Sequence, residues 1–154
     1  MNLGPLSHVG IATPSMSEAI IFWRDVMGAS AIHRPFDLED HGVRVCFLDT
    51  PGRGRSDDGP LPGTRIQLLE PLGPDSPIAR FLARTPRGGQ HHLCFEVPDI
   101  AEARTDFEAQ GARILGPTRI GALGTPIFFI HPHDMHGLLI KIMETPAEGA
   151  HWSN

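Results

Sequence analysis

The feature that most constrains this chain is an internal repeat. Residues 7–19 read SHVGIATPSMSEA, and residues 91–103 read HHLCFEVPDIAEA. An offset of 84 residues aligns the two segments and matches His8 with His92, Pro14 with Pro98, Met16 with Ile100, Glu18 with Glu102 and Ala19 with Ala103. Each segment has the pattern of a strand, a break at proline and a helix, so the sequence predicts a duplicated unit.

Helix signals follow the first strand of each copy. Ser15 and Glu18 form a capping box, in which the serine side chain accepts a backbone N–H and the glutamate reaches back, and Asp99 with Glu102 repeats it. We expect these helices to end at Gly28 and Gly111, and a shorter helix to cover residues 77–84 behind Ser76.

The remaining pattern predicts strands joined by turns. We expect strands near 6–12, 29–34, 43–49, 64–70, 90–97, 112–116, 126–131 and 137–144, and a mobile loop over 50–63. The fold class is therefore α+β, with two tandem βαβββ modules. The expected boundaries within one structural domain are a first module at 1–72, a linker with a short helix at 73–88, a second module at 89–146 and a tail at 147–154.

Composition narrows the classes of partner. The net charge is −5 and the pI about 5.9, which disfavours nucleic acid and anionic membranes as partners. No apolar run reaches the ~18 residues of a membrane helix, and no basic segment with an apolar core opens the chain. Cys46 and Cys94 lie in apolar runs, which favours reduced thiols and a cytoplasmic location.

Strand alternation places one polar side chain on the less apolar face of four predicted strands. These side chains are His8, Gln67, His92 and Lys141, two from each copy. Independent polar residues on a solvated face would give the same pattern. The repeat instead favours an arrangement in which these side chains converge. Two imidazoles with an amide oxygen can then hold a metal ion.

Longer stretches carry a resemblance to a known family. They are LSHVGIATPSMSEAIIFWRDVMG, LLEPLGPDSPIARFL, GGQHHLCFEVPDI, RIGALGTPIFFIHPHD and HGLLIKIME. Together they resemble the vicinal oxygen chelate (glyoxalase/bleomycin-resistance) superfamily, and most closely its methylmalonyl-CoA epimerase branch. The resemblance implies paired βαβββ modules whose curled sheet surrounds a divalent metal (Co, Mn, Ni, Zn or Fe), with His8, Gln67 and His92 as ligands. It also implies a homodimer acting on a small-molecule substrate.

The position of the fourth metal ligand departs from that family pattern. Lys141, the only lysine in the chain, stands where such epimerases carry a glutamate ligand. An ammonium about 4 Å from a dication is repelled by roughly 8 kcal/mol at an effective dielectric near 20. Three outcomes are open: metal with a neutral or displaced Lys141, an ammonium in the place of the metal, or a site that only binds. We expect Lys141 to be catalytic.

The resemblance implies isomerase (epimerase) or lyase chemistry on a carbonyl compound or acyl-CoA thioester through an enolate-type intermediate. Two alternatives stay open. One is a metal-free protein that sequesters a small molecule, and the other is a biosynthetic cyclase or isomerase that uses Lys141. We expect His131, His133 and His136 to be solvated loop residues rather than metal ligands.

Overall fold

The computed structural model describes residues 2–147 and divides the chain into two compact units. Residues 8–91 form the N-terminal unit, and the described residues 2–7 and 92–147 form the C-terminal unit. All but the first residue of the predicted tail, 147–154, lies outside the described residues. Within the described residues, no helix is long and apolar enough to span a bilayer.

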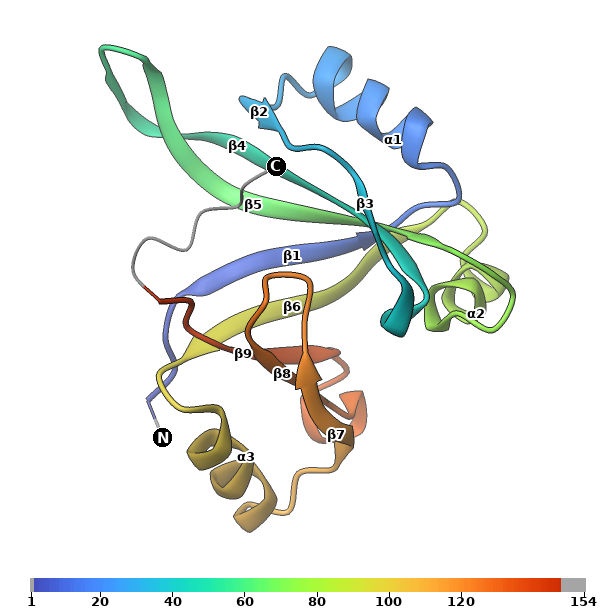
Figure 1. The fold of residues 1–154 in the computed structure, drawn as a ribbon, viewed down its shortest axis with the longest axis vertical. Coiled ribbons are helices and arrows are strands. Elements are labelled where there is room, and N and C mark those ends of the chain that lie inside the picture. Colours follow the sequence, from blue (N-terminus) through green and yellow to red (C-terminus); the bar gives the residue numbers. More distant parts are fainter. Residues whose placement is uncertain (1, 148–154) are drawn as a thin grey trace. The chain divides into compact units, whose positions relative to one another are not determined.

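The N-terminal unit contains a mixed sheet with the order β2-β4-β5-β1 (Figure 1). Strand β1 runs parallel to β5, whereas β2, β3 and β5 pair antiparallel with β4. Its elements are β1 (Leu6–Ala12), α1 (Met16–Ile21), a π-helical turn (Phe22–Val26), β2 (Ala31–Ile32), β3 (Phe36–Leu38), a 3-10 turn (Glu39–His41), β4 (Val43–Ser56), β5 (Gly59–Pro71) and α2 (Pro77–Arg84).

The C-terminal unit repeats this plan with the order β6-β9-β8-β7. Strand β6 is parallel to β9, and the other pairs are antiparallel. Its elements are β6 (Gly89–Val97), α3 (Ile100–Ala109), β7 (Ile114–Ile120), β8 (Pro126–Ile130), a 3-10 turn (Pro132–Asp134) and β9 (Ile140–Glu144). The prediction of an α+β fold built from two βαβββ modules is confirmed.

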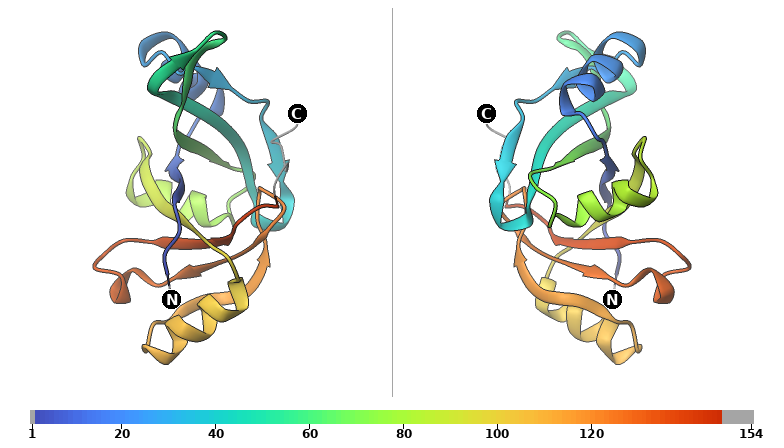
Figure 2. Two further views of the ribbon diagram at one scale, coloured as in Figure 1. Left: turned by 90° about the vertical axis from the view of Figure 1, so that its left-hand side faces the viewer. Right: turned by 90° about the vertical axis from the view of Figure 1, so that its right-hand side faces the viewer.

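Each unit has an apolar core between its helix and one face of its sheet. In the N-terminal unit the buried members are Met16, Cys46, Leu48, Ile66 and Leu68. In the C-terminal unit they are Val97, Ile100, Ala103, Phe128, Ile130, Ile140 and Ile142, and α3 lies along the strands of this unit (Figure 2). Because strand side chains alternate, the opposite face of each sheet carries the polar positions.

The first turns of α1 and α3 are capped in the same way. The N–H of Glu18 donates to Ser15 Oγ (3.3 Å), and that of Glu102 donates to Asp99 Oδ1 (2.9 Å), as predicted. The expected return bond from Glu18 to Ser15 is wrong, because the N–H of Ser15 donates to Thr13 Oγ1. A glutamate at the end of a strand in each unit, Glu70 of β5 and Glu144 of β9, instead accepts the first helical N–H.

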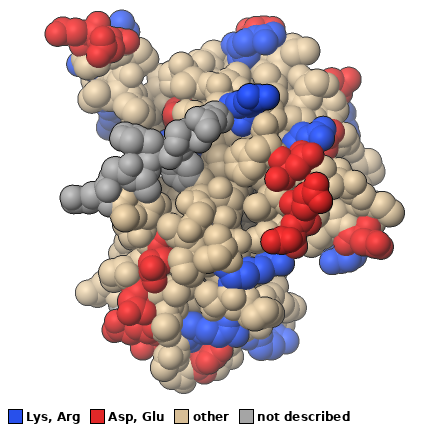
Figure 3. All heavy atoms as spheres, viewed as in Figure 1, with Lys and Arg blue, Asp and Glu red and all other residues tan. Residues whose placement is uncertain are grey.

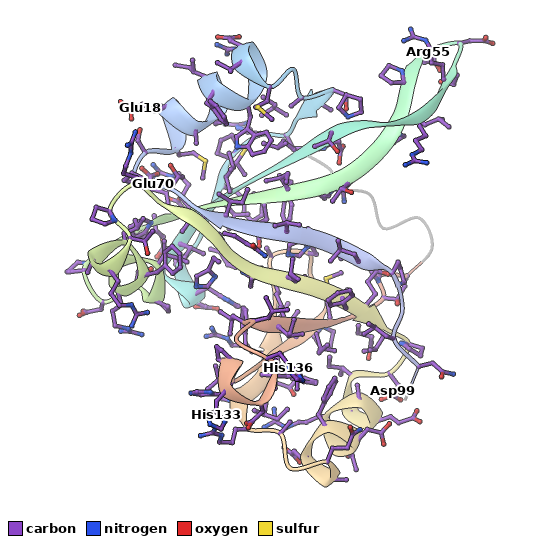
Figure 4. All side chains as sticks on the ribbon, turned by 180° about the vertical axis from the view of Figure 1, so that it is seen from behind. Glu18, Arg55, Glu70, Asp99, His133 and His136 are labelled. Atoms are coloured by element: carbon purple, nitrogen blue, oxygen red, sulfur yellow. The ribbon has the colours of Figure 1, made fainter. Side chains whose placement is uncertain are left out.

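The two N–H groups are those of Met16, which donates to Glu70 Oε1 (3.3 Å), and Ile100, which donates to Glu144 Oε2 (3.1 Å). Glu70 lies beside α1 and Asp99 at the start of α3 in Figure 4. A carboxylate at a helix N-terminus satisfies an orphan donor and opposes the helix dipole.

The predicted mobile loop over 50–63 is wrong. Strands β4 and β5 continue through it as a long hairpin that turns at Asp57 and Asp58. Figure 1 shows this hairpin extending past its neighbouring strands, and charged residues of both signs gather at its tip in Figure 3. Glycine permits the pairing, because a Cβ on Gly63 would lie 2.7 Å from the carbonyl oxygen of Pro51.

Other boundaries also differ from the predicted ones. The strand expected at 29–34 is shorter, because only Ala31–Ile32 form β2, and β3 (Phe36–Leu38) follows after Pro35. The strand expected at 137–144 begins at Ile140, because residues 132–137 form a 3-10 turn and a further turn. The first predicted helix ends at Val26, two residues before Gly28, and its second half widens into the π-helical turn.

Candidate active site

The polar face of the N-terminal unit carries His8 and Gln67 on adjacent strands. Gly10 of β1 pairs with Gln67 of β5, so His8 lies two residues away on the same face. His8 is fully buried and Gln67 is 2% exposed. The His8 ring packs edge-on against Phe47 at 5.7 Å between centroids. Gln67 Oε1 is buried with no hydrogen-bond partner among the described residues, so it is available to a ligand.

The equivalent face of the C-terminal unit carries His92 and Lys141. Cys94 of β6 pairs with Lys141 of β9. His92 lies two residues before Cys94 and therefore on the same face. His92 is 3% exposed and Lys141 4% exposed. The His92 ring packs edge-on against Phe129 at 5.5 Å between centroids. Lys141 Nζ lies 5.8 Å from the centroid of the same ring, within the range of a cation–π contact.

The two units therefore present one arrangement twice. Phe47 pairs with Gln67 in the N-terminal unit, and Phe129 pairs with Lys141 in the C-terminal unit. In each unit a histidine two residues before the paired position packs against that phenylalanine. Gln67 and Lys141 thus occupy the same position of the repeat, one as an amide and the other as an amine.

Burial determines the protonation behaviour of this face. Burial lowers the pKa of Lys141, and the positive charge of Arg119 lowers it further, whereas Cys94 opposes the shift. The Cys94 thiol is itself fully buried, and burial raises its pKa to about 11. Cys94 therefore stays a thiol at neutral pH, and Lys141 is a better proton acceptor than a solvated lysine.

Glu144 does not replace the missing carboxylate of the family pattern. It lies three residues after Lys141, and its Oε2 is hydrogen-bonded to the backbone N–H of Ile100 at the start of α3. Its side chain thus serves the helix face of the sheet rather than the face of Lys141.

The residues fit a divalent metal only in part. The imidazoles of His8 and His92 and the unpartnered amide oxygen of Gln67 are ordinary metal donors. Among the described residues, however, no group of three or more histidine, cysteine, aspartate or glutamate side chains could hold an ion. A charged Lys141 on the face of His92 repels a dication. The divalent metal of the family therefore does not fit beside a charged Lys141.

Three further polar residues lie on the face of His8 and Gln67. Asp49 accepts hydrogen bonds from His33 Nε2 (3.1 Å) and Arg65 Nε (2.9 Å). Sequence reasoning missed this cluster. Asp49 and Arg65 bounded the segment interpreted as a loop, and their pairing across β4 and β5 is visible only once the hairpin is known.

The histidine cluster near β8 lies at the strand end. His131 Nδ1 accepts the N–H of His133, and His133 Nδ1 is 3.2 Å from Asp134 Oδ1. His133 and His136 project from the turn between β8 and β9 in Figure 4. These contacts tie His131 and His133 to their own turn.

Comparison with known proteins identifies the family. Residues 7–129 match the family model described as the Glyoxalase/Bleomycin resistance protein/Dioxygenase superfamily. The chain belongs to this superfamily. Among curated members, it is 44% identical over 142 residues to the ethylmalonyl-CoA/methylmalonyl-CoA epimerase of Cereibacter sphaeroides, covering 91% of this chain and 97% of that protein. It is 39% identical to the mitochondrial methylmalonyl-CoA epimerase of Homo sapiens, covering 92% of this chain and 74% of that protein.

Solved structures of superfamily members agree. A variant of Streptomyces coelicolor methylmalonyl-CoA epimerase in complex with 2-nitronate-propionyl-CoA has a TM-score of 0.81 and 31% identity, covering 95% of this chain and all of that one. A methylmalonyl-CoA epimerase in complex with methylmalonyl-CoA and NH4+ has a TM-score of 0.80 and 31% identity, covering 95% of this chain and 97% of that one. The predicted resemblance is confirmed: the chain is a methylmalonyl-CoA epimerase-like member of the superfamily.

Proposed function

We propose that this protein is an acyl-CoA epimerase that inverts the carbon between a thioester and a carboxylate, with methylmalonyl-CoA as its test substrate. The observation that carries the proposal is the likeness to epimerases across more than nine-tenths of the chain. The two buried histidines and Gln67 on the face opposite the helices support it.

The reaction removes a proton from the carbon next to the thioester carbonyl and leaves an enolate-type intermediate. An enzyme must stabilise the negative oxygen of that intermediate with a cation or with hydrogen-bond donors. We assign this role to Lys141, as an ammonium that donates to the oxygen or returns a proton to the carbon. His8, Gln67 and His92 are the candidate ligands if a divalent ion binds when Lys141 is neutral.

The test is isotope exchange. We expect the purified protein to incorporate deuterium at C2 of methylmalonyl-CoA in D₂O, both with a chelator and with added Co²⁺ or Mn²⁺. Mass spectrometry of the recovered thioester measures the incorporation. Absence of exchange under every condition would exclude the epimerase assignment.

Lys141 specifically favours a second candidate function. A site that has exchanged a carboxylate for an amine could bind a small molecule without metal and without turnover. That candidate predicts a rise in melting temperature with ligand and no exchange. It also predicts no bound metal by elemental analysis. A further alternative is a cyclase, isomerase or lyase that uses Lys141 on another carbonyl compound. Such an enzyme would lose its activity in the variant Lys141→Met.

The remaining assignments concern the protein's state in the cell. We propose a homodimer, as the family resemblance implies, and a cytoplasmic location. The two buried free thiols, Cys46 and Cys94, are compatible with a reducing compartment. Light scattering coupled to gel filtration should give twice the 16.8 kDa chain mass. A monomer mass at micromolar concentration would reject the dimer.

A further inference from the structure

A buried carboxylate holds a histidine at the edge of the N-terminal sheet. Asp49 is 8% exposed, and its two oxygens are bonded to His33 Nε2 (3.1 Å) and Arg65 Nε (2.9 Å). The His33 side chain is 30% exposed, so the ring is partly accessible while Asp49 holds its Nε2. The roles proposed so far use none of these three residues.

This cluster shares a sheet face with Gln67 and His8. Ala31 pairs with Asp49 across β2 and β4. His33 lies two residues further along the chain, on the same face, and its N–H donates to the carbonyl of Phe47. Phe47 in turn pairs with Gln67. His33 and Gln67 therefore lie in one row across the sheet, roughly 10 Å apart at two strand spacings.

The hydrogen-bond pattern fixes the tautomer of His33. Burial opposes ionisation of Asp49, but the hydrogen bonds from His33 and Arg65 outweigh it and lower the pKa of this carboxyl. A carboxylate can only accept, so His33 Nε2 carries the hydrogen. The lone pair then lies on Nδ1, which makes no hydrogen bond within residues 2–147. A carboxylate behind an imidazole also stabilises the imidazolium that forms when Nδ1 accepts a proton.

The repeat indicates that the module itself does not need this histidine. Leu115 occupies the corresponding place in the C-terminal unit, because it pairs with Phe129 as His33 does with Phe47. The same fold position is thus apolar in one copy and a carboxylate-bound imidazole in the other. That difference points to chemistry rather than to packing.

We propose that His33 is a catalytic base of the proposed epimerase and that Asp49 is its positioning residue. This inference rests on the proposed function. His33 Nδ1 accepts the C2 proton from one face of the substrate as the C–H bond breaks. The electron pair of that bond moves to the thioester oxygen as an enolate, and a different acid returns a proton on the opposite face. His33 then releases its proton to solvent and the acid takes up a proton from solvent, so both groups are regenerated and no oxidant or reductant is needed.

The experiment follows isotope exchange from each epimer separately. Purified (2R)- and (2S)-methylmalonyl-CoA are incubated in D₂O with wild-type protein, His33→Gln and Asp49→Asn, and early deuterium uptake is measured. We expect His33→Gln to lose exchange from one epimer by at least about 100-fold, and to keep exchange from the other within about threefold. Asp49→Asn should slow exchange from the same epimer by about tenfold or more, because it removes the carboxylate that stabilises the imidazolium.

A matched control is His41→Gln, which changes a histidine of the same unit on the 3-10 turn before β4. It should exchange both epimers at the wild-type rate, and thermal melts verify that every variant is folded. Two outcomes overturn the inference while leaving the proposed function intact: unchanged exchange from both epimers in His33→Gln, or an equal loss from both. If wild-type protein exchanges neither epimer, the proposed function itself fails.

Discussion

Lys141 is a departure from the family pattern at a single buried side chain. It is the only lysine of the sequence, it is 4% exposed, and it shares a sheet face with His92. A single amine in place of a carboxylate reverses the sign of the charge presented to a bound ion or an oxyanion. Changing that residue should therefore change metal affinity more than stability.

With the ligand set that the family resemblance implies (His8, Gln67 and His92), we expect Lys141→Glu to bind Co²⁺ at about one ion per chain, with a visible absorption spectrum, because the variant adds a carboxylate oxygen donor. Wild-type protein should not bind the ion tightly. The control is Lys141→Met, which removes the charge without adding an oxygen donor. Equal Co²⁺ binding by wild-type protein and Lys141→Glu would contradict this view of the lysine.

Asp49 gives a prediction on acid stability. Its pKa in the folded protein lies below the ordinary carboxyl value. The ionised form therefore contributes stability above the ordinary carboxyl pKa, and this contribution is lost as the pH falls through the folded pKa. Wild-type protein should lose more unfolding free energy between pH 5 and pH 3 than Asp49→Asn, as measured by urea denaturation. Equal losses in both proteins would count against a stabilising His33–Asp49–Arg65 cluster.

At the scale of elements, the sequence predicted the type of each core element better than its ends. The alternating strands and capped helices were found because their patterns are local. The hairpin at 50–63 was missed, since its glycines and prolines resemble a loop and only pairing along two strands reveals that Gly63 accommodates a close backbone. The contact of Glu144 with the N–H of Ile100 also needed the fold, because the two residues are far apart in the sequence.

The paired helix caps give the prediction at this scale. Glu144→Ala should lower the free energy of unfolding by about 1 kcal/mol, because the first N–H of α3 loses its acceptor, and Glu70→Ala should do the same for α1. Urea denaturation measures both. Glu108→Ala, on the exposed side of α3, is the control and should change stability by less than about 0.5 kcal/mol. If Glu144→Ala and Glu70→Ala lower the free energy of unfolding no more than this control does, the two glutamates do not stabilise the helices.

At the scale of the whole molecule, the repeat made both the fold and the candidate residues predictable. Equivalent strands carry His8 and His92, so a pattern found once could be checked in the second copy. The same symmetry could not predict the His33 cluster, because its counterpart, Leu115, is apolar and breaks the repeat. The two copies share the same backbone fold. Residues with a specific chemical role must therefore be sought at the positions where the copies differ.

A reciprocal exchange tests this equivalence. The double variant Gln67→Lys with Lys141→Gln should melt at a higher temperature than Gln67→Lys alone, because it buries one amine instead of two. Differential scanning calorimetry measures the melting temperatures of both variants. A double variant that is no more stable than the single one would mean that the two positions differ in their surroundings despite their common register.

The common register of Gln67 and Lys141 also bears on how such a protein can acquire new chemistry. A duplicated module contains two copies of each position, so a residue can be substituted in one copy while the equivalent residue in the other copy keeps the original geometry. Ancestry could then be traced by asking which half of a present-day sequence has drifted from its sister, without recourse to any other protein.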